Sequence, residues 1–151
     1  ASFANILASR GYNLIITGRR KEKIQKLANE LSKKYNIKID VIIAELSNEK
    51  DIKDIVKYIS KTKNIDTLIN NAGYSIYKNF SDSAVAENEN MISVHILAVI
   101  KIINAVLPKM IRQGYGNIIN VSSLGANIFA NDAPIPLVAP VIIAILFNLF
   151  S

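Results

Sequence analysis

Hydrophobic positions along most of the chain follow two alternating spacings. Four short apolar runs, rich in isoleucine, have the length and composition of strands: 12–18, 37–46, 65–73 and 116–123. Three stretches between them repeat apolar residues every three or four positions, as one face of a helix does: 21–35, 47–61 and 84–112. A further helix is predicted over 1–10. Helices and strands are therefore expected to alternate as far as residue 123.

Residues at the expected helix ends support this division. Gly11 follows the first helix as a glycine C-cap would, and Ser47 or Asn48 is a candidate N-cap for the third. Pro108 is expected to interrupt the long helix over 84–112. Strict alternation with apolar strands predicts the α/β class, a doubly wound parallel sheet of the Rossmann type with helices on both faces.

The composition changes towards the C-terminus. Of the last 39 residues only Asp132 is charged, and the segment 126–151 is apolar with three prolines. Val138–Phe150 is shorter than the roughly 18 to 20 apolar residues that span a bilayer, and Pro140 breaks it. We expect a buried or interface helix there and no membrane partner. The chain is expected to form one partial domain over 1–151 with this atypical segment at its end.

Composition narrows the function. The 151 residues carry a formal charge of +6, but the lysines of 21–35 alternate with apolar helical positions and lack interleaved aromatic residues. A solvated helix face is therefore favoured over a nucleic-acid site. With no cysteine and a single histidine, His95, neither a disulfide framework nor a metal site is expected. The first residues are unlike a signal peptide, so a cytoplasmic protein is the expectation.

Candidate functional residues lie at the carboxyl ends of the predicted strands or directly after them, because ligands of a doubly wound sheet bind there. These positions hold Arg19 and Arg20, Glu45 and Leu46, Asn71, Ala72 and Gly73, and Ser122 and Ser123. Arginine forks suit a phosphate group, and small residues let a ligand approach the backbone. Two surface arginines that begin a helix, and a plain tight turn, are the alternatives.

Three segments carry a family resemblance through their order and spacing. They are RGYNLIITGRR near the start, NNAG after the third strand and LPKMIRQGYGNIINVSS after the long helix. Together they resemble the short-chain dehydrogenase/reductase family over Ala1 to about Gly125. The resemblance implies an NAD(P)-dependent oxidoreductase that transfers a hydride between its cofactor and a small carbonyl or alcohol substrate.

The resemblance also implies a cofactor site. Arg19 and Arg20 would lie at the adenosine ribose, where they favour NADP(H) over NAD(H). Glu45 and Leu46 stand where the family frames the adenine with an acidic and an apolar residue. The turn against the cofactor would consist of Asn71, Ala72 and Gly73.

For catalysis, the resemblance points to Ser123, which matches the serine that holds the substrate oxygen while a tyrosine exchanges the proton and a lysine lowers that tyrosine's pKa. His95 stands where the family usually has an asparagine on the long helix. A hydrogen-bonding role there, or simple polar packing between helices, are the two interpretations of this histidine.

The sequence departs from the family pattern in two places. The glycine-rich TGxxxGxG turn is expected just before Ala1, and with it the central strand of the sheet is expected to be missing. The YxxxK pair should begin the helix after Ser123, where this chain has Pro136 and Pro140. Tyr74 and Lys78 have that spacing, but they precede Ser123 and are expected in a loop.

Three interpretations of these departures remain open. The chain is a truncated or frame-disturbed copy of a reductase, a degenerate member that binds a nucleotide or a partner without catalysis, or a structural subunit whose C-terminal helix packs in a homo-oligomer. Without a phenol to exchange the proton, little or no reductase activity is expected of this chain alone.

Overall fold

Helices and strands alternate along the chain as the hydrophobic pattern predicts. The computed structural model describes residues 2–121 and 143–147. In order, the elements are α1 (Ser2–Ser9), β1 (Asn13–Gly18), α2 (Lys21–Tyr35), β2 (Ile39–Ile43), α3 (Glu49–Lys61), β3 (Thr67–Asn70), the short 3-10 helix η1 (Phe80–Asp82), α4 (Val85–Ile92), the π-helical turn η2 (Ser93–Leu97), α5 (Ala98–Gln113), β4 (Asn117–Asn120) and β5 (Ile143–Phe147).

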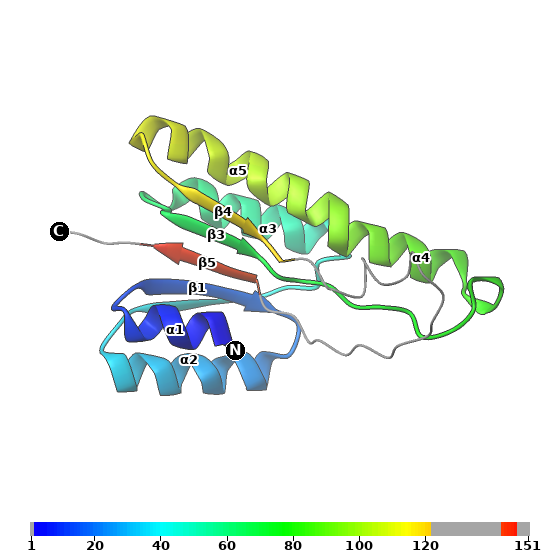
Figure 1. Ribbon diagram of the computed structural model, residues 1–151, viewed down its shortest axis with the longest axis horizontal. Helices are drawn as coiled ribbons and strands as arrows, with labels where there is room; N and C mark the ends of the chain where they lie inside the picture. Colours follow the sequence, from blue (N-terminus) through cyan, green and yellow to red (C-terminus); the bar gives the residue numbers. More distant parts are fainter. Residues whose placement is uncertain (1, 122–142, 148–151) are drawn as a thin grey trace, which may run out of the picture.

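The strands form one sheet in the order β2-β1-β5-β3-β4 (Figure 1). β1 pairs in parallel with β2, and β3 pairs in parallel with β4. β5 runs antiparallel to both of its neighbours, so that Ile145 lies opposite Ile15 on one side and Leu68 on the other. Because β5 is antiparallel to β1 and to β3, all four of β1 to β4 end at the same edge of the sheet, which we call the carboxyl edge.

β5 corrects two expectations from the sequence. Ile143–Phe147 are a strand and not part of a buried or interface helix, and the centre of the sheet is filled. A short apolar run does not distinguish a buried strand from a buried helix by periodicity alone. Backbone groups on the facing sides of β1 and β3 need hydrogen-bond partners, and a strand between them supplies these. The other residues of 126–151 lie outside the described part of the chain.

The sheet is covered on both faces by helices. Successive residues of β1 point to opposite faces: Ile16 packs in the cluster under α1 and α2 with Leu31, whereas Ile15 packs in the cluster under α3 and α5 with Ile102. Figure 1 shows these two helical layers on either side of the strands. Each fully buried isoleucine contributes about 1.5–3 kcal/mol. The doubly wound arrangement is thus stabilised from both sides.

Polar contacts stabilise the start of α3 and join its last turns to the sheet. Asn48 caps its start, because the Oδ1 atom accepts from the backbone nitrogens of Lys50 and Asp51 at 2.9 and 3.3 Å. Near its end, the Tyr58 hydroxyl donates to the Asp40 carboxylate of β2 at 2.7 Å. Burial, followed by this hydrogen bond and the charge of Asp40, raises the pKa of Tyr58 to about 12.

The long helical stretch Val85–Gln113 contains an irregular turn, but not at the proline. Pro108 lies inside α5, which continues to Gln113, whereas the π-helical turn lies at Ser93–Leu97. The expected interruption at Pro108 is wrong. Beyond the proline the helix is held by buried Met110 and by Lys109, whose Nζ donates to two carbonyls at the end of α3.

The length and composition of this stretch would also suit a membrane-spanning helix. An 18-residue window within it has a mean hydropathy of 2.0. Its buried residues, such as Ala98, Ile102 and Val106, face α3 and the sheet, and several apolar residues on the other side are exposed. One side of the helix is therefore part of the core of the doubly wound fold.

Candidate functional site

The end of β1 brings an exposed arginine to the carboxyl edge. Gly18 ends the strand, and a Cβ atom there would lie 2.7 Å from Cδ1 of Ile24 in α2. Glycine at this position leaves room for the end of the Ile24 side chain. Arg19 follows, and its Nη1 atom lies 3.4 Å from Oε2 of Glu45. Arg20 precedes α2 and is also exposed.

The segment after β2 places an acidic residue beside that arginine. The Glu45 backbone nitrogen donates to the Asp51 carboxylate at 2.7 Å, while the Glu45 carboxylate accepts from the Ser47 backbone nitrogen at 3.5 Å and from Arg19 at 3.4 Å. Leu46 is 7% exposed and packs in the core cluster under α3. At this position the carboxyl edge therefore offers the carboxylate of Glu45 and the backbone of Leu46.

The segment after β3 carries the residues of the NNAG motif, where the sequence predicts a turn. Asn71, Ala72 and Gly73 follow the strand without regular structure and are half-buried. Ala72 and Tyr74 pack against the core cluster under α3. The pKa of Tyr74 is raised first by burial and then by the charge of Glu45, and Arg19 acts in the opposite direction. The Arg19–Glu45 pair therefore lies close enough to Tyr74, the residue after Gly73, to interact with it electrostatically.

His95 connects this turn to the irregular helix. Its Nε2 atom lies 3.0 Å from the backbone nitrogen of Tyr74 and 2.8 Å from the Tyr74 carbonyl oxygen. A Cβ atom at Gly73 would lie 2.4 Å from Cε1 of the same ring. A π-helical turn shifts the register of a helix and is frequent at functional sites. Here the turn carries the histidine that touches the loop.

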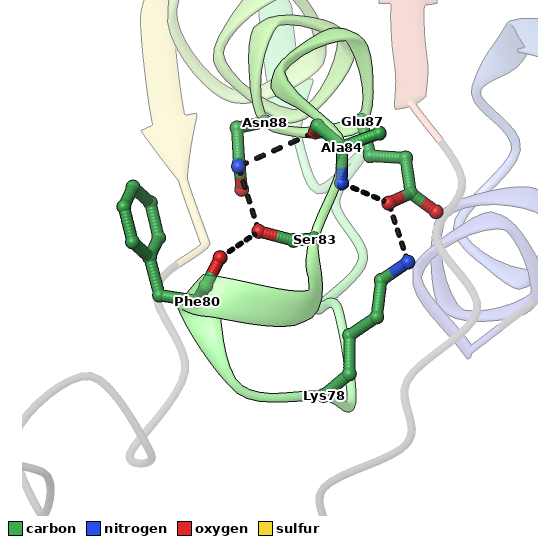
Figure 2. A network of polar contacts seen from close by, with 6 residues as sticks. All are labelled: Lys78, Phe80, Ser83, Ala84, Glu87 and Asn88. Atoms are coloured by element: carbon green, nitrogen blue, oxygen red, sulfur yellow. Dashed lines mark hydrogen bonds and ion pairs between the residues drawn. The ribbon is translucent and has the colours of Figure 1, made fainter.

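Tyr74 and Lys78 are not arranged as a pair that begins a helix. Lys78 lies in the loop after the turn and forms an ion pair with Glu87 of α4, which also accepts from the backbone nitrogen of Ala84 at 2.8 Å (Figure 2). The Lys78 hydrogen bond, followed by the bond from Ala84, lowers the pKa of Glu87. The ammonium group of Lys78 is thus paired with a carboxylate in the first turn of α4.

The same network orders the chain between the turn and α4. The Ser83 hydroxyl donates to the Phe80 carbonyl at 2.7 Å, and Asn88 Nδ2 donates to the Ser83 oxygen at 2.9 Å (Figure 2). Together with Glu87, these contacts hold the loop against the first turn of the helix. The loop after the turn is therefore built by its own polar side chains.

One contact at the carboxyl edge was missed from the sequence. Asn70 ends β3 and is 4% exposed, and its Nδ2 atom donates to Oδ1 of Asn120, which ends β4 and is its register partner. The signal was present, because TLIN and NIIN both place an asparagine at the last strand position. This cross-strand bond joins the ends of two neighbouring strands directly before the turn.

The remaining candidate, Ser123, lies outside the described residues, as does Ser122. Within residues 2–121, six of the candidates lie at the carboxyl edge: Arg19, Glu45, Asn71, Ala72, Gly73 and His95. Arg20 is next to Arg19 in the chain, and the side chain of Leu46 packs in the core. This arrangement can present a guanidinium and a backbone turn to an anionic, elongated ligand.

Comparison with known proteins identifies the family. The family model for short chain dehydrogenases matches residues 1–132. A protein of Staphylococcus aureus described as an uncharacterized oxidoreductase is 31% identical over 124 residues, which are 82% of this chain and 52% of that protein. The chain belongs to the short-chain dehydrogenase/reductase family of oxidoreductases.

Two further relatives show the range within the family. The human inactive hydroxysteroid dehydrogenase-like protein 1 is 32% identical over 124 residues, covering 81% of this chain and 38% of that protein. A short-chain dehydrogenase from Sphingobium yanoikuyae, solved in complex with NADPH, superposes with a TM-score of 0.80 at 26% identity, covering 85% of this chain and 51% of that one. The chain spans about half the length of these relatives or less.

Proposed function

We propose that the chain is the nucleotide-binding part of an NADP(H)-dependent oxidoreductase that interconverts a carbonyl and an alcohol. The observation that carries the proposal is the gathering of Arg19, Glu45 and the Asn71–Gly73 turn at one edge of a doubly wound sheet. Ligands of such sheets bind at this edge. The NADPH-bound relative from Sphingobium yanoikuyae supports the choice of cofactor.

The residues present fit this cofactor chemically. The exposed guanidinium of Arg19 suits the 2′-phosphate that NADP(H) carries and NAD(H) lacks. The Asn71–Gly73 turn would lie against the middle of the cofactor, since its small residues let a ligand approach the backbone. When bound, the nicotinamide ring supplies or accepts the hydride. Ser123 would hold the substrate oxygen.

We further propose that catalysis by this chain is impaired. After Tyr115 the sequence contains neither tyrosine nor lysine, so no phenol is available at the position that would exchange the proton. A hydride delivered to a carbonyl would leave an alkoxide without a proton donor. The human relative whose name includes "inactive" supports a non-catalytic member of the same fold as the second candidate function.

Calorimetric titration tests the binding part of this proposal. The chain is titrated with NADPH and, separately, with NADH at the same ionic strength. Tighter binding of NADPH is expected, because Arg19 has a partner in the 2′-phosphate and not in the 2′-hydroxyl. If neither nucleotide binds, the nucleotide-binding proposal is wrong.

An activity assay tests the catalytic part. The chain is incubated with NADPH and a reactive diketone, and the loss of absorbance of the reduced nicotinamide is followed. No turnover above the protein-free control is expected. Clear turnover would show that another group supplies the proton and would contradict the proposed impairment.

The remaining partners follow from the same reasoning. A small carbonyl or alcohol compound is the proposed substrate, and the lysine-rich α2 is proposed to be a solvated surface and not a nucleic-acid site. We propose a cytoplasmic location, which the absence of cysteine from the given sequence fits.

A further inference from the structure

The contact between His95 and Tyr74 has two mutually exclusive forms. A single ring nitrogen, Nε2, lies within hydrogen-bond distance of both the Tyr74 nitrogen and the Tyr74 carbonyl oxygen, at 3.0 and 2.8 Å. Without a proton Nε2 can only accept from the N–H group, and with a proton it can only donate to the carbonyl. The protonation state of this nitrogen therefore selects which backbone group of the loop is held.

We propose that His95 is a pH-dependent positioning residue for the Asn71–Gly73 turn. In the neutral ring the proton is on Nδ1, and Nε2 accepts from the Tyr74 amide. Protonation of the ring places a proton on Nε2, which then donates to the Tyr74 carbonyl and releases the amide. The proposal rests on the proposed function only in assigning the turn to cofactor binding, since the contact between His95 and Tyr74 itself involves no nucleotide.

Gly73 has a close-approach role in this contact. A Cβ atom at Gly73 would lie 2.4 Å from Cε1 and 3.0 Å from Nδ1 of His95, so the ring fills the space beside the glycine. Positive φ angles at glycines occur at Gly11 and Gly114 among the described residues, so backbone conformation is not the reason for glycine at 73. An alanine there would push the ring away from Tyr74.

Charged groups from several other segments lie around the loop. Arg19 from the segment after β1, Glu45 from the segment after β2 and Glu87 from α4 all act on the pKa of the Tyr74 phenol. Lys78, in the loop, is paired with Glu87. Carboxylic acids, phenols and amines ordinarily titrate outside about pH 5 to 8, whereas imidazole titrates within this range. A change at Tyr74 in this range therefore reports on His95.

The rings of His95 and Tyr74 also lie side by side, with centroids 6.0 Å apart and planes inclined at 55°. The pKa of Tyr74 is raised above its ordinary value, so its phenol remains neutral throughout the imidazole titration. Of these two rings, only the His95 imidazole gains a charge in this pH range. The Tyr74 backbone is the group whose hydrogen bond changes in response.

Nuclear magnetic resonance tests the proposal on the full chain, without nucleotide, so that a failure of cofactor binding does not affect the result. The chain contains one histidine, which gives a single imidazole signal. The ring nitrogens of His95 and the backbone amide of Tyr74 are followed between about pH 5 and 8. We expect both to titrate with the same midpoint. Amide exchange at Tyr74, corrected for its intrinsic pH dependence, should be about fivefold faster with the ring protonated.

Two variants separate positioning from simple packing. His95→Gln provides both a donor and an acceptor that do not titrate, so Tyr74 should stay protected and lose its pH dependence. Gly73→Ala retains the imidazole but should displace it, so the ring titrates while the Tyr74 amide does not. Circular dichroism checks that each variant is folded. If Gly73→Ala does not fold, the result for His95→Gln decides the proposal by itself.

The outcomes against the proposal are specific. It is overturned if the Tyr74 amide is unchanged while the His95 ring titrates in the unmodified chain. It is equally overturned if Tyr74 continues to titrate in the folded His95→Gln variant, since another group would then be responsible.

Discussion

Arg19→Ala tests whether the carboxyl edge recognises the 2′-phosphate of NADP(H). The substitution removes a guanidinium that is 67% exposed and that pairs with Glu45 at 3.4 Å. An exposed ion pair contributes about 0–1 kcal/mol to stability, so the free variant should unfold at nearly the same denaturant concentration as the parent chain. Any larger effect on binding must then come from the ligand.

The expected loss can be worked from this geometry. A hydrogen bond to a charged group contributes about 1.5–3 kcal/mol, and the exposure of Arg19 favours the lower end. About 1.5 kcal/mol corresponds to roughly tenfold weaker binding of NADPH. NADH, which lacks the phosphate, should bind as before. Glu45→Gln should act in the opposite direction by a few-fold, because it removes a carboxylate that competes for the guanidinium.

The assay is calorimetric titration with both nucleotides at two ionic strengths. Arg112→Ala is the matched control, because it removes the same charge from an exposed position near the end of α5, away from the carboxyl edge. The effect of Arg19→Ala on NADPH should shrink at high salt. Equal weakening of NADPH and NADH would refute the reasoning, since Arg19 would then contact a group that both nucleotides share.

Three further predictions concern stability, each measured by urea unfolding. Tyr58→Phe should lower the free energy of unfolding by about 1 kcal/mol at neutral pH. Because the folded pKa of Tyr58 is raised from 10.0 to about 12, this stabilisation is present below pH 10 and is lost as the pH rises through 12. Tyr77→Phe, at a side chain 60% exposed, is the control, and an equal loss there would contradict the assignment. Ile102→Ala should cost about 2–5 kcal/mol because Ile102 is 0% exposed, whereas Ile100→Ala on the same helix, at 50% exposure, should cost far less. Ile145→Pro should cost about 1–3 kcal/mol or more, since it removes a backbone donor from the centre of the sheet, and unchanged stability would show that β5 does not complete the sheet.

Much of the fold could be predicted from local pattern. Helix α2 spans Lys21–Tyr35, the same residues that its apolar spacing indicates, because an amphipathic stripe of this period is itself the signal of a helix packed on a sheet. The predicted strands are longer by one or more residues than the observed ones. A residue that flanks a strand without a backbone hydrogen-bond partner can be of the same type as a residue within the strand, so the sequence does not mark the boundary. Asn48 was one of two candidate N-caps for α3, and its side chain is the one that accepts from the backbone nitrogens of the first turn.

The candidate site was predicted in part for a related reason. In a parallel sheet the residue after each strand necessarily lies at the carboxyl edge, so Arg19, Glu45 and Asn71 could be brought together from strand positions alone. The contact of His95 with the Tyr74 backbone could not, because His95 lies in a π-helical turn that the apolar spacing does not reveal and its partner is 21 residues away in the sequence. Asn70 was passed over because its partner, Asn120, is distant in sequence.

The sequence by itself determined the class of the protein, because hydrophobic period and motif order are properties of neighbouring residues and survive without a structure. It also shows that no tyrosine or lysine follows Tyr115 within the 151 residues. Only the tertiary structure decided that Ile143–Phe147 occupy the centre of the sheet in the antiparallel direction. A short apolar segment has no local preference for a neighbour or a direction, and the open backbone hydrogen-bonding groups of β1 and β3 supply both.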